Sequence, residues 1–194
     1  MTHQGQPSHH LYVLLVGRAR YFYVSPEGRK YILKWIAPGH TFGEATLTAD
    51  PYIVGTEAVQ DVSGIFWERS TIRSLALRFP KFLENIIHHA IGHLHWYIAS
   101  YAALSSQPAR RRIANLIVVL APAIGHKHAS GEIEIDVTNE ELASSTCVNQ
   151  YTISRILSEW ERSGAIRKGR GKLFIHSPEQ FFHKAMRVGK THTT

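Results

Sequence analysis

The segment from Thr138 to Leu157 reads TNEELASSTCVNQYTISRIL, a pattern of two short helices joined by a tight turn. The small Ala143 lets two helices approach closely, and Ile153 and Ile156 recur on one side of the second helix, where they can pack against the first. This spacing predicts a helix-turn-helix. It therefore restricts the C-terminal part of the chain to a small helical domain built around that motif.

Capping residues mark where the two helices begin. Thr138 and Glu141 fit the S/T-x-x-E capping box, and Asn149 is a favourable N-cap for the second helix. The polar residues of the second helix then face outward, where they can meet base edges in a DNA major groove. We expect the motif to contact DNA through Thr138, Asn149, Gln150, Tyr151, Thr152, Ser154 and Arg155. The alternative is an ordinary pair of amphipathic helices.

A cationic hairpin is predicted after the second helix. Ser163-Gly164 is a suitable helix stop, and short runs at 165–167 and 173–176 flank the tip KGRGK at 168–172. Cations at such a tip can reach phosphates, so we expect DNA contacts from Arg170 and Lys172. The alternative is a solvated turn.

Charge is distributed unevenly along the 194 residues. Residues 107–194 carry 13 Lys and Arg against 8 Asp and Glu, whereas residues 1–106 carry 9 against 7. This excess favours a polyanionic partner for the C-terminal part, although a modest basic excess is also typical of a solvated surface.

Several protein classes are excluded by composition. The longest apolar stretch, Leu116 to Ile124, is shorter than a membrane span, and the first residues lack the apolar core of a signal peptide. A single cysteine, Cys147, rules out an intrachain disulfide and a four-cysteine zinc or iron–sulfur site. We therefore expect a cytoplasmic protein that does not bind membranes.

The N-terminal half has the pattern of short strands followed by a long helix. The runs LYVLLV, ARYFYV and KYILKWI alternate with turns, which predicts an antiparallel, jelly-roll-like β-roll. A helix is then expected from about Pro80 to Ser105. Its apolar residues recur at intervals of four and three, as in a coiled-coil seam, at Leu83, Ile87, Ala90, Leu94, Tyr97, Tyr101 and Leu104. This seam predicts a parallel homodimer, and the alternative is a helix that packs only on its own β-roll.

The expected fold is therefore α+β, with a sensor-like β-roll, a long dimerisation helix and a winged helix-turn-helix. A hinge is expected at Ser105 to Pro108, where serines and a proline interrupt the helical pattern. We expect the β-roll to occupy residues 1–74, the dimerisation helix 75–106 and the DNA-binding domain 107–194.

Nearly the whole chain resembles the CRP/FNR family of bacterial transcription regulators. Residues 11–47 resemble the family's cyclic-nucleotide-binding-type β-roll, with Gly17, the Pro38-Gly39 turn and the Phe42-Gly43-Glu44 signature. The long helix resembles the family's dimerisation helix, and residues 138–175 are similar to its winged helix. The resemblance implies an effector pocket at Gly43 and Glu44, with RNA polymerase as a candidate partner.

The chain departs from the family pattern at four places. Members that bind cyclic AMP follow Gly-Glu with an Arg-Ser/Thr pair, but no arginine lies between Glu44 and Trp67, so we expect no tight cyclic AMP binding. The cysteines of the oxygen-sensing branch are absent. The chain also begins late, without the family's opening helix and about one strand. Finally, Cys147 stands where the turn usually has glycine, in a left-handed conformation, and Tyr151 where many members have glutamate.

Histidines suggest a second possibility for the sensor. His89 and His93 are one helical turn apart, a spacing that can bind zinc, and gas-sensing relatives use haem. No third ligand accompanies them, so we expect no cofactor and no metal site, with a haem- or metal-binding sensor or an effector-independent regulator as alternatives. An enzyme is not expected, because no phosphate-binding glycine loop or catalytic triad pattern is present.

Overall fold

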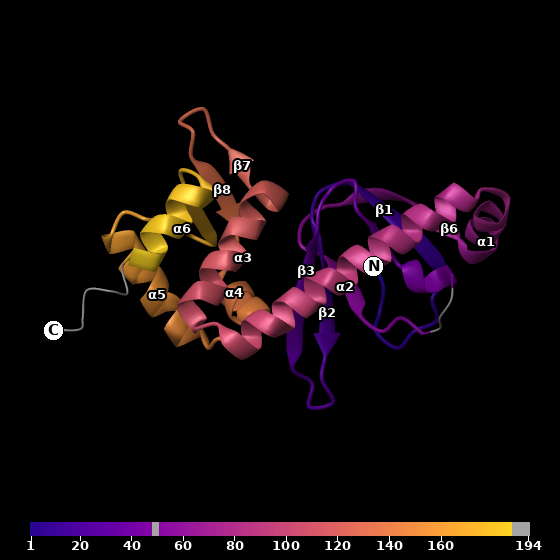
Figure 1. The fold of residues 1–194 in the computed structure, drawn as a ribbon, viewed down its shortest axis with the longest axis horizontal. Coiled ribbons are helices and arrows are strands. Elements are labelled where there is room, and N and C mark those ends of the chain that lie inside the picture. Colours follow the sequence, from indigo (N-terminus) through magenta and orange to yellow (C-terminus); the bar gives the residue numbers. More distant parts are fainter. Residues whose placement is uncertain (48–50, 188–194) are drawn as a thin grey trace. The chain divides into compact units, whose positions relative to one another are not determined.

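In the computed structural model, residues 1–47 and 51–187 are described, and the chain divides into two compact units, Met1–Tyr101 and Ala102–Thr194 (Figure 1). Strands dominate the first unit and helices the second, which confirms the predicted α+β class. Among the described residues, no helix has the length and apolar character needed to cross a membrane.

The first unit contains two three-stranded antiparallel sheets, with strand orders β4-β1-β6 and β3-β2-β5. Their bounds are β1 His10–Val16, β2 Ala19–Val24, β3 Lys30–Ile36, β4 Thr41–Phe42, β5 Gly55–Ala58 and β6 Ser63–Glu68, with a 3-10 turn, η1, at Glu44–Leu47. The three apolar runs predicted as strands form β1, β2 and β3. Alternate residues of these strands point inward, and Leu14, Ala19, Tyr21 and Ile36 form a core together with Phe42 of β4.

Two helices follow the roll, α1 at Arg69–Arg78 and α2 at Pro80–Ser106. The start of α2 packs on the roll through Ile86, which shares a buried cluster with Leu11 and Ile72. Farther along, the indole Nε1 of Trp96 donates a hydrogen bond to the carbonyl of Leu33 at 3.1 Å. One face of α2 is thus attached to its own roll over several turns.

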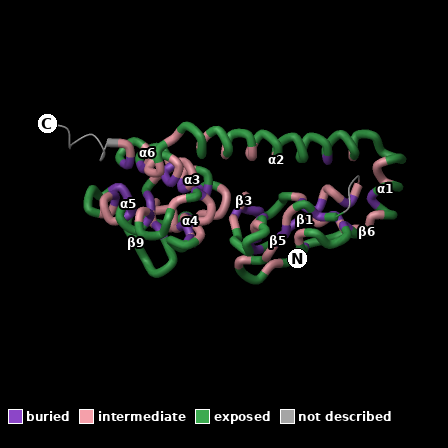
Figure 2. Tube along the Cα trace, turned by 90° about the horizontal axis from the view of Figure 1, so that it is seen from below, coloured by how far each residue is buried: buried purple, intermediate pink, exposed green. Residues whose placement is uncertain are grey.

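The adjacent face of α2 is apolar and exposed. Figure 2 accordingly colours most of the helix as exposed. We call this face the α2 stripe, and it consists of Leu83, Ile87, Ile91, Leu94, Ile98 and Tyr101. It shares four positions with the predicted seam, and two further predicted residues, Ala90 and Leu104, are also exposed. Tyr97, by contrast, is half-buried on the side of the roll, where burial raises the pKa of its hydroxyl and the charge of Glu44 adds to the effect. A straight helix turns every 3.6 residues, so its exposed stripe drifts from a strict heptad seam.

The second unit is a helical domain with a small antiparallel sheet of order β7-β8-β10-β9. Its elements are α3 Ala109–Ile124, β7 His126–Lys127, β8 Ile133–Asp136, α4 Asn139–Thr146, α5 Gln150–Arg162, β9 Arg167–Gly169, β10 Lys172–Ile175 and α6 Pro178–Arg187. Trp160 lies fully buried at its centre, stacks edge-to-face on Phe181, and donates from Nε1 to the carbonyl of Ala185 at 3.1 Å.

The hairpin after α5 is shifted from its predicted position. The prediction of a strand at 165–167 was wrong by two residues, because Ala165 and Ile166 are buried in the domain core and β9 begins only at Arg167. The connecting turn is consequently just Arg170-Gly171, with Gly171 at φ +68°. This tight hairpin of β9 and β10 is called the wing below.

Candidate nucleic-acid interface

The predicted caps form at both helices of the motif. Thr138 Oγ1 accepts a hydrogen bond from the Glu141 backbone N–H at 3.2 Å, and the Glu141 carboxylate accepts one from the Thr138 N–H at 2.7 Å. Asn149 Oδ1 accepts from the Thr152 N–H at 2.8 Å. The capping box and the second N-cap are therefore confirmed, and the start of each helix is held by local bonds.

The turn between α4 and α5 depends on Cys147. This residue adopts φ 50° and ψ 45°, the left-handed conformation predicted from the family pattern, and it is the only non-glycine residue with positive φ in the described part of the chain. The next residue, Val148, donates its N–H to the carbonyl of Ala143 at 3.2 Å. The chain therefore reverses within one residue, at a conformational cost of about 1 kcal/mol.

Helix α5 has one buried and one exposed side. Ile153, Ile156, Leu157 and Trp160 are buried, and they fix the helix on the domain core. The exposed side chains include Gln150, Ser154 and Arg155, and Tyr151 retains 81% of its exposure. Thr152 is half-buried. The predicted contact residues of α5 thus lie on one accessible side of a rigid helix.

Arg155 is oriented by a neighbouring carboxylate. Its Nη1 lies 3.0 Å from Oε1 of Glu159, one helical turn away, and Glu159 also forms an ion pair with Arg110 of α3. Because a guanidinium has five N–H donors, this single contact leaves most of them available for another acceptor. The arrangement presents Arg155 outward with a defined direction.

A shallow groove separates the start of α4 from the wing. Its volume is about 390 Å³, and Thr138, Asn139, Lys168, Gly169, Gly171 and Lys172 contribute to its walls. The first backbone N–H groups of a helix and two lysines make this a setting suited to an anion. Thr138 and Lys172, predicted from separate motifs, are brought together here.

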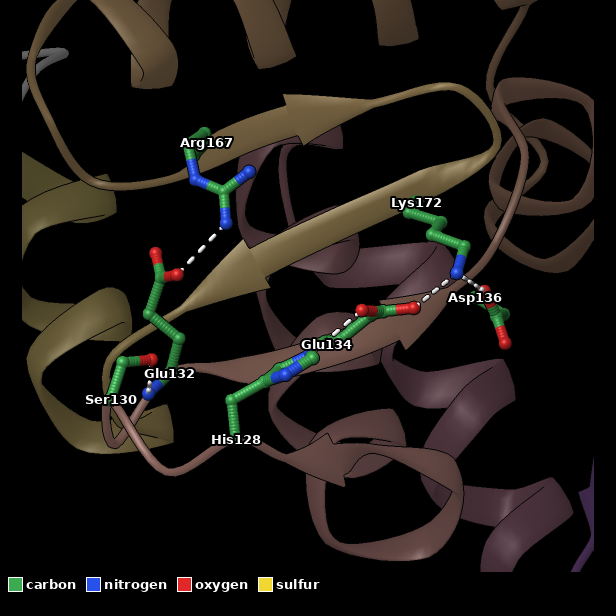
Figure 3. Close-up of polar contacts among 7 residues, drawn as sticks. All are labelled: His128, Ser130, Glu132, Glu134, Asp136, Arg167 and Lys172. Carbon is green, nitrogen blue, oxygen red and sulfur yellow. Dashed lines mark hydrogen bonds and ion pairs between the residues drawn. The ribbon is translucent and has the colours of Figure 1, made fainter.

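Most wing cations already contact carboxylates of the same unit. Arg167 Nη2 lies 2.8 Å from Glu132, Lys168 Nζ lies 2.9 Å from Glu161, and Lys172 pairs with Glu134. Figure 3 shows Arg167 and Lys172 on neighbouring strands, each turned toward acids of the β8 region. Arg170, at the exposed turn, has no such partner among the described residues. Sequence reasoning missed the acids that pair with these cations, although the alternation EIEID at 132–136 indicates that Glu132, Glu134 and Asp136 share a face of their strand.

Gly43 and Glu44, the predicted effector residues, lie in the first unit at the start of η1. Gly43 has φ +88°, and a Cβ there would lie 2.6 Å from the carbonyl oxygen of His10, so only glycine fits. Glu44 accepts a hydrogen bond from Thr41 Oγ1 at 2.9 Å. Nearby, the hydroxyl of Tyr21 is buried without a hydrogen-bond partner among the described residues, and burial raises its pKa well above the usual value.

Histidines from two segments face the same region. His93 of α2 stacks edge-to-face on Tyr21 at 5.5 Å, and His40 Nδ1 accepts a hydrogen bond from the Ala37 N–H at 3.1 Å. Burial lowers the pKa of both imidazoles, and nearby Lys34 and His89 lower them further, whereas Glu44 opposes the effect at His93. No three His, Cys, Asp or Glu side chains within residues 1–47 and 51–187 are placed to hold a metal ion.

Two protein-family models match the chain. The cyclic nucleotide-binding domain model matches residues 1–79, and the Crp-like helix-turn-helix domain model matches residues 111–181. Among characterised relatives, a CRP-like cAMP-activated global transcriptional regulator of Mycobacterium tuberculosis is 22% identical over 94% of this chain and 82% of its own length. The transcriptional regulator SdrP of Thermus thermophilus is 26% identical over 86% of this chain and 79% of its own.

Solved structures share this fold. A CRP-family transcriptional regulator from Thermus thermophilus superposes with a TM-score of 0.81 and 23% identity, over 96% of this chain and 92% of its own. FixK2 from Bradyrhizobium japonicum superposes with a TM-score of 0.82 and 18% identity, over 94% and 90%. At these identities the structures establish the architecture alone.

Proposed function

The chain belongs to the CRP/FNR family of DNA-binding transcription regulators, and we propose that it binds a pseudo-palindromic operator as a homodimer, without tight binding of cyclic AMP. In this proposal residues 1–74 form the effector-type roll, residues 75–106 join two copies, and residues 107–194 bind DNA. The observation that carries it is the exposed polar side of α5 on a fully buried apolar base.

Base reading is assigned to the exposed residues of α5. Arg155 has the donor geometry for O6 and N7 of guanine, and Gln150 can both donate to and accept from adenine. Tyr151 has no carboxylate to accept a hydrogen bond from cytosine N4 as glutamate does, so the half-site differs from that of members with glutamate there. Thr138, Asn149, Thr152 and Ser154 are assigned to backbone contacts or positioning, together with Arg170 and Lys172 of the wing.

Dimerisation is assigned to the α2 stripe. Six large apolar residues remain exposed on one face of α2, although other exposed positions of the same helix carry polar residues such as His88 and His95. An exposed apolar stripe of this length is typical of an interface. A second copy of α2, packed in parallel, would cover it and place two reading helices about 34 Å apart.

The cyclic AMP part of the proposal is supported by the residues around Glu44. Lys34 and His93 interact electrostatically with Glu44, and no arginine follows Glu44 before Arg69. A cyclic phosphate placed there would lack the bidentate partner that a guanidinium supplies. Titration calorimetry should detect no micromolar binding of cyclic AMP, and heat from such binding would contradict this part.

The decisive experiment is selection of bound duplexes from a random-sequence pool by the full-length protein. We expect an inverted repeat with half-site centres about one helical turn apart. Arg155→Ala should weaken binding to the selected operator by roughly 1–3 kcal/mol and relax the preference at one base position.

Arg162→Ala is the matched control, because it removes the same charge from the last turn of α5, where the Arg162 side chain bonds to the Ser158 carbonyl at 3.4 Å. It should leave the sequence preference unchanged. A pool that enriches no repeat, or an Arg155→Ala variant with an unaltered preference, would show that α5 does not read bases.

A further inference from the structure

The wing of a DNA-binding domain is expected to supply phosphate contacts, yet here carboxylates of the same unit hold most of its cations. Three pairs are formed: Arg167 with Glu132, Lys168 with Glu161, and Lys172 with Glu134. Glu132 and Glu134 come from the region of β8, which pairs with β10, and Glu161 comes from the end of α5. The pairing is therefore tertiary and does not reflect neighbours in the sequence.

The two lysine pairs are supported by further contacts. Glu161 also accepts a hydrogen bond from the Lys168 backbone N–H at 3.1 Å, and Lys168 Nζ donates to Ser158 Oγ at 3.1 Å. Lys172 Nζ lies 3.5 Å from a second acid, Asp136. The lysines thus have two acceptors each, which favours the inward conformations over extended ones.

The network of Lys172 continues to a histidine. Oε1 of Glu134 meets Lys172, while Oε2 lies 2.7 Å from His128 Nε2, as Figure 3 shows. These hydrogen bonds keep the pKa of Glu134 below its usual value, and that of Glu161 is likewise lowered by Lys168. Both carboxylates therefore carry a full negative charge at neutral pH.

We propose that Glu134 and Glu161 restrain DNA affinity by competing with phosphates for Lys172 and Lys168, so that Arg170 supplies most of the wing's phosphate binding. This inference rests on the proposed DNA-binding function. When a phosphate binds Lys172, Glu134 loses its partner and its carboxylate is left without a neighbouring cation. DNA releases one condensed cation on binding Lys172, but the unpaired carboxylate attracts a cation from solution, so the net release is close to zero. Arg170 incurs no such exchange.

The restraint acts on affinity that is independent of base sequence, because phosphate contacts carry no sequence information. Both lysines line the groove beside the start of α4, where an anion would sit. Weakening these contacts shifts the discrimination between sites onto the base-reading residues of α5. The two acids are accordingly specificity-related residues outside the reading helix.

The test uses Glu134→Gln and Glu161→Gln in the full-length protein, which remove each charge but keep a hydrogen-bond acceptor. Binding is measured by fluorescence anisotropy on the selected operator and on a scrambled duplex, over a series of salt concentrations. Each substitution should strengthen binding about two- to fivefold, equally on both duplexes. The slope of log affinity against log salt should steepen by roughly one per freed lysine.

The matched controls are Glu179→Gln and Glu27→Gln, which remove the same charge at exposed positions of the second and the first unit. They should change affinity less than twofold. Arg170→Gln should weaken binding to both duplexes and make the salt slope shallower by roughly one.

Lys172→Met decides the matter through a double-mutant cycle. In the wild-type background, where Glu134 holds Lys172, it should weaken binding about two- to threefold, whereas in the Glu134→Gln background it should weaken binding further and abolish the gain. An equal loss in both backgrounds, or no gain from either glutamine variant, would overturn the inference while leaving operator selection intact. If the wild-type protein selects no operator, it is the proposed function that fails.

Discussion

The two units of the chain differ in whether their apolar faces are covered and their buried polar groups hydrogen-bonded within one copy of the chain. In the second unit, the core closes around Trp160 and the helix-turn-helix is capped at both helices by its own side chains. In the first unit, the α2 stripe is left uncovered and the buried Tyr21 hydroxyl has no partner within the described residues. The surface proposed to contact DNA is therefore complete within one unit. The roll and α2 instead leave an apolar face and a buried hydroxyl that a second copy or an effector would satisfy.

Trp160→Ala should produce the largest difference in stability between the two units. Truncating this fully buried side chain should destabilise the second unit by about 3–5 kcal/mol and abolish operator binding. The other three tryptophans, Trp35, Trp67 and Trp96, lie in the first unit, so the fluorescence of the variant reports on that unit alone. Its unfolding midpoint should match that of the wild-type first unit. A shifted midpoint would show that the units do not unfold independently.

Leu94→Asp combined with Ile98→Asp tests whether the α2 stripe needs a second copy. Two carboxylates within an apolar interface are costly to bury, so sedimentation equilibrium should find a monomer. Operator affinity should fall at least about a hundredfold, because two linked half-site contacts are lost. The paired control His88→Asp with His95→Asp changes exposed polar positions of the same helix and should stay dimeric. A dimeric stripe variant would place the interface elsewhere.

Acid should weaken the first unit selectively. His93 and His40 have lowered pKa values in the folded state, so below about pH 6.5 the unfolded chain binds more protons. The stability that these neutral imidazoles contribute is present above that pH and is lost as the pH falls through their folded values. Denaturant titrations between pH 7.5 and pH 5, followed by the tryptophans of the first unit, measure this loss.

His93→Gln is the variant for that titration, and exposed His88→Gln is its control. His93→Gln should reduce the loss of stability of the first unit between pH 7.5 and pH 5, and His88→Gln should leave that loss unchanged. The groups that face His93 are Glu44, Lys34, His40, His89 and Tyr21, so a profile unaltered by His93→Gln would assign the titration to His40.

Tyr21→Phe has the smallest expected effect, and it tests whether the buried Tyr21 hydroxyl of the roll lacks a hydrogen-bond partner. Removing a buried hydroxyl without a partner should raise the free energy of unfolding of the first unit by up to about 1 kcal/mol. Tyr23→Phe, at an exposed position of the same strand, should have no effect. A loss of stability in Tyr21→Phe would instead indicate that the hydroxyl is hydrogen-bonded in solution.

Local patterns predicted a large share of this molecule. The capping residues and the apolar side of α5 depend on neighbours within about four residues, and both were readable from spacing alone. The left-handed turn at Cys147 was expected from the family resemblance. The three strands β1 to β3 were likewise apparent, because alternation is a property of the strand itself. The wing was placed less accurately, since burial of Ala165 and Ile166 depends on the core around them.

Long-range arrangements were decided by the tertiary structure. Composition counted Arg167, Lys168 and Lys172 as available cations, and only the packing of β8 and α5 beside the wing showed that carboxylates hold them. Periodicity marked α2 as apolar on one side, but contact with the roll determined that Tyr97 is covered while Ile91 and Ile98 are exposed. Hydrogen-bonded turns and amphipathic periods arise within one segment, whereas ion pairs and buried faces require two segments to meet, and that meeting is set by the fold as a whole.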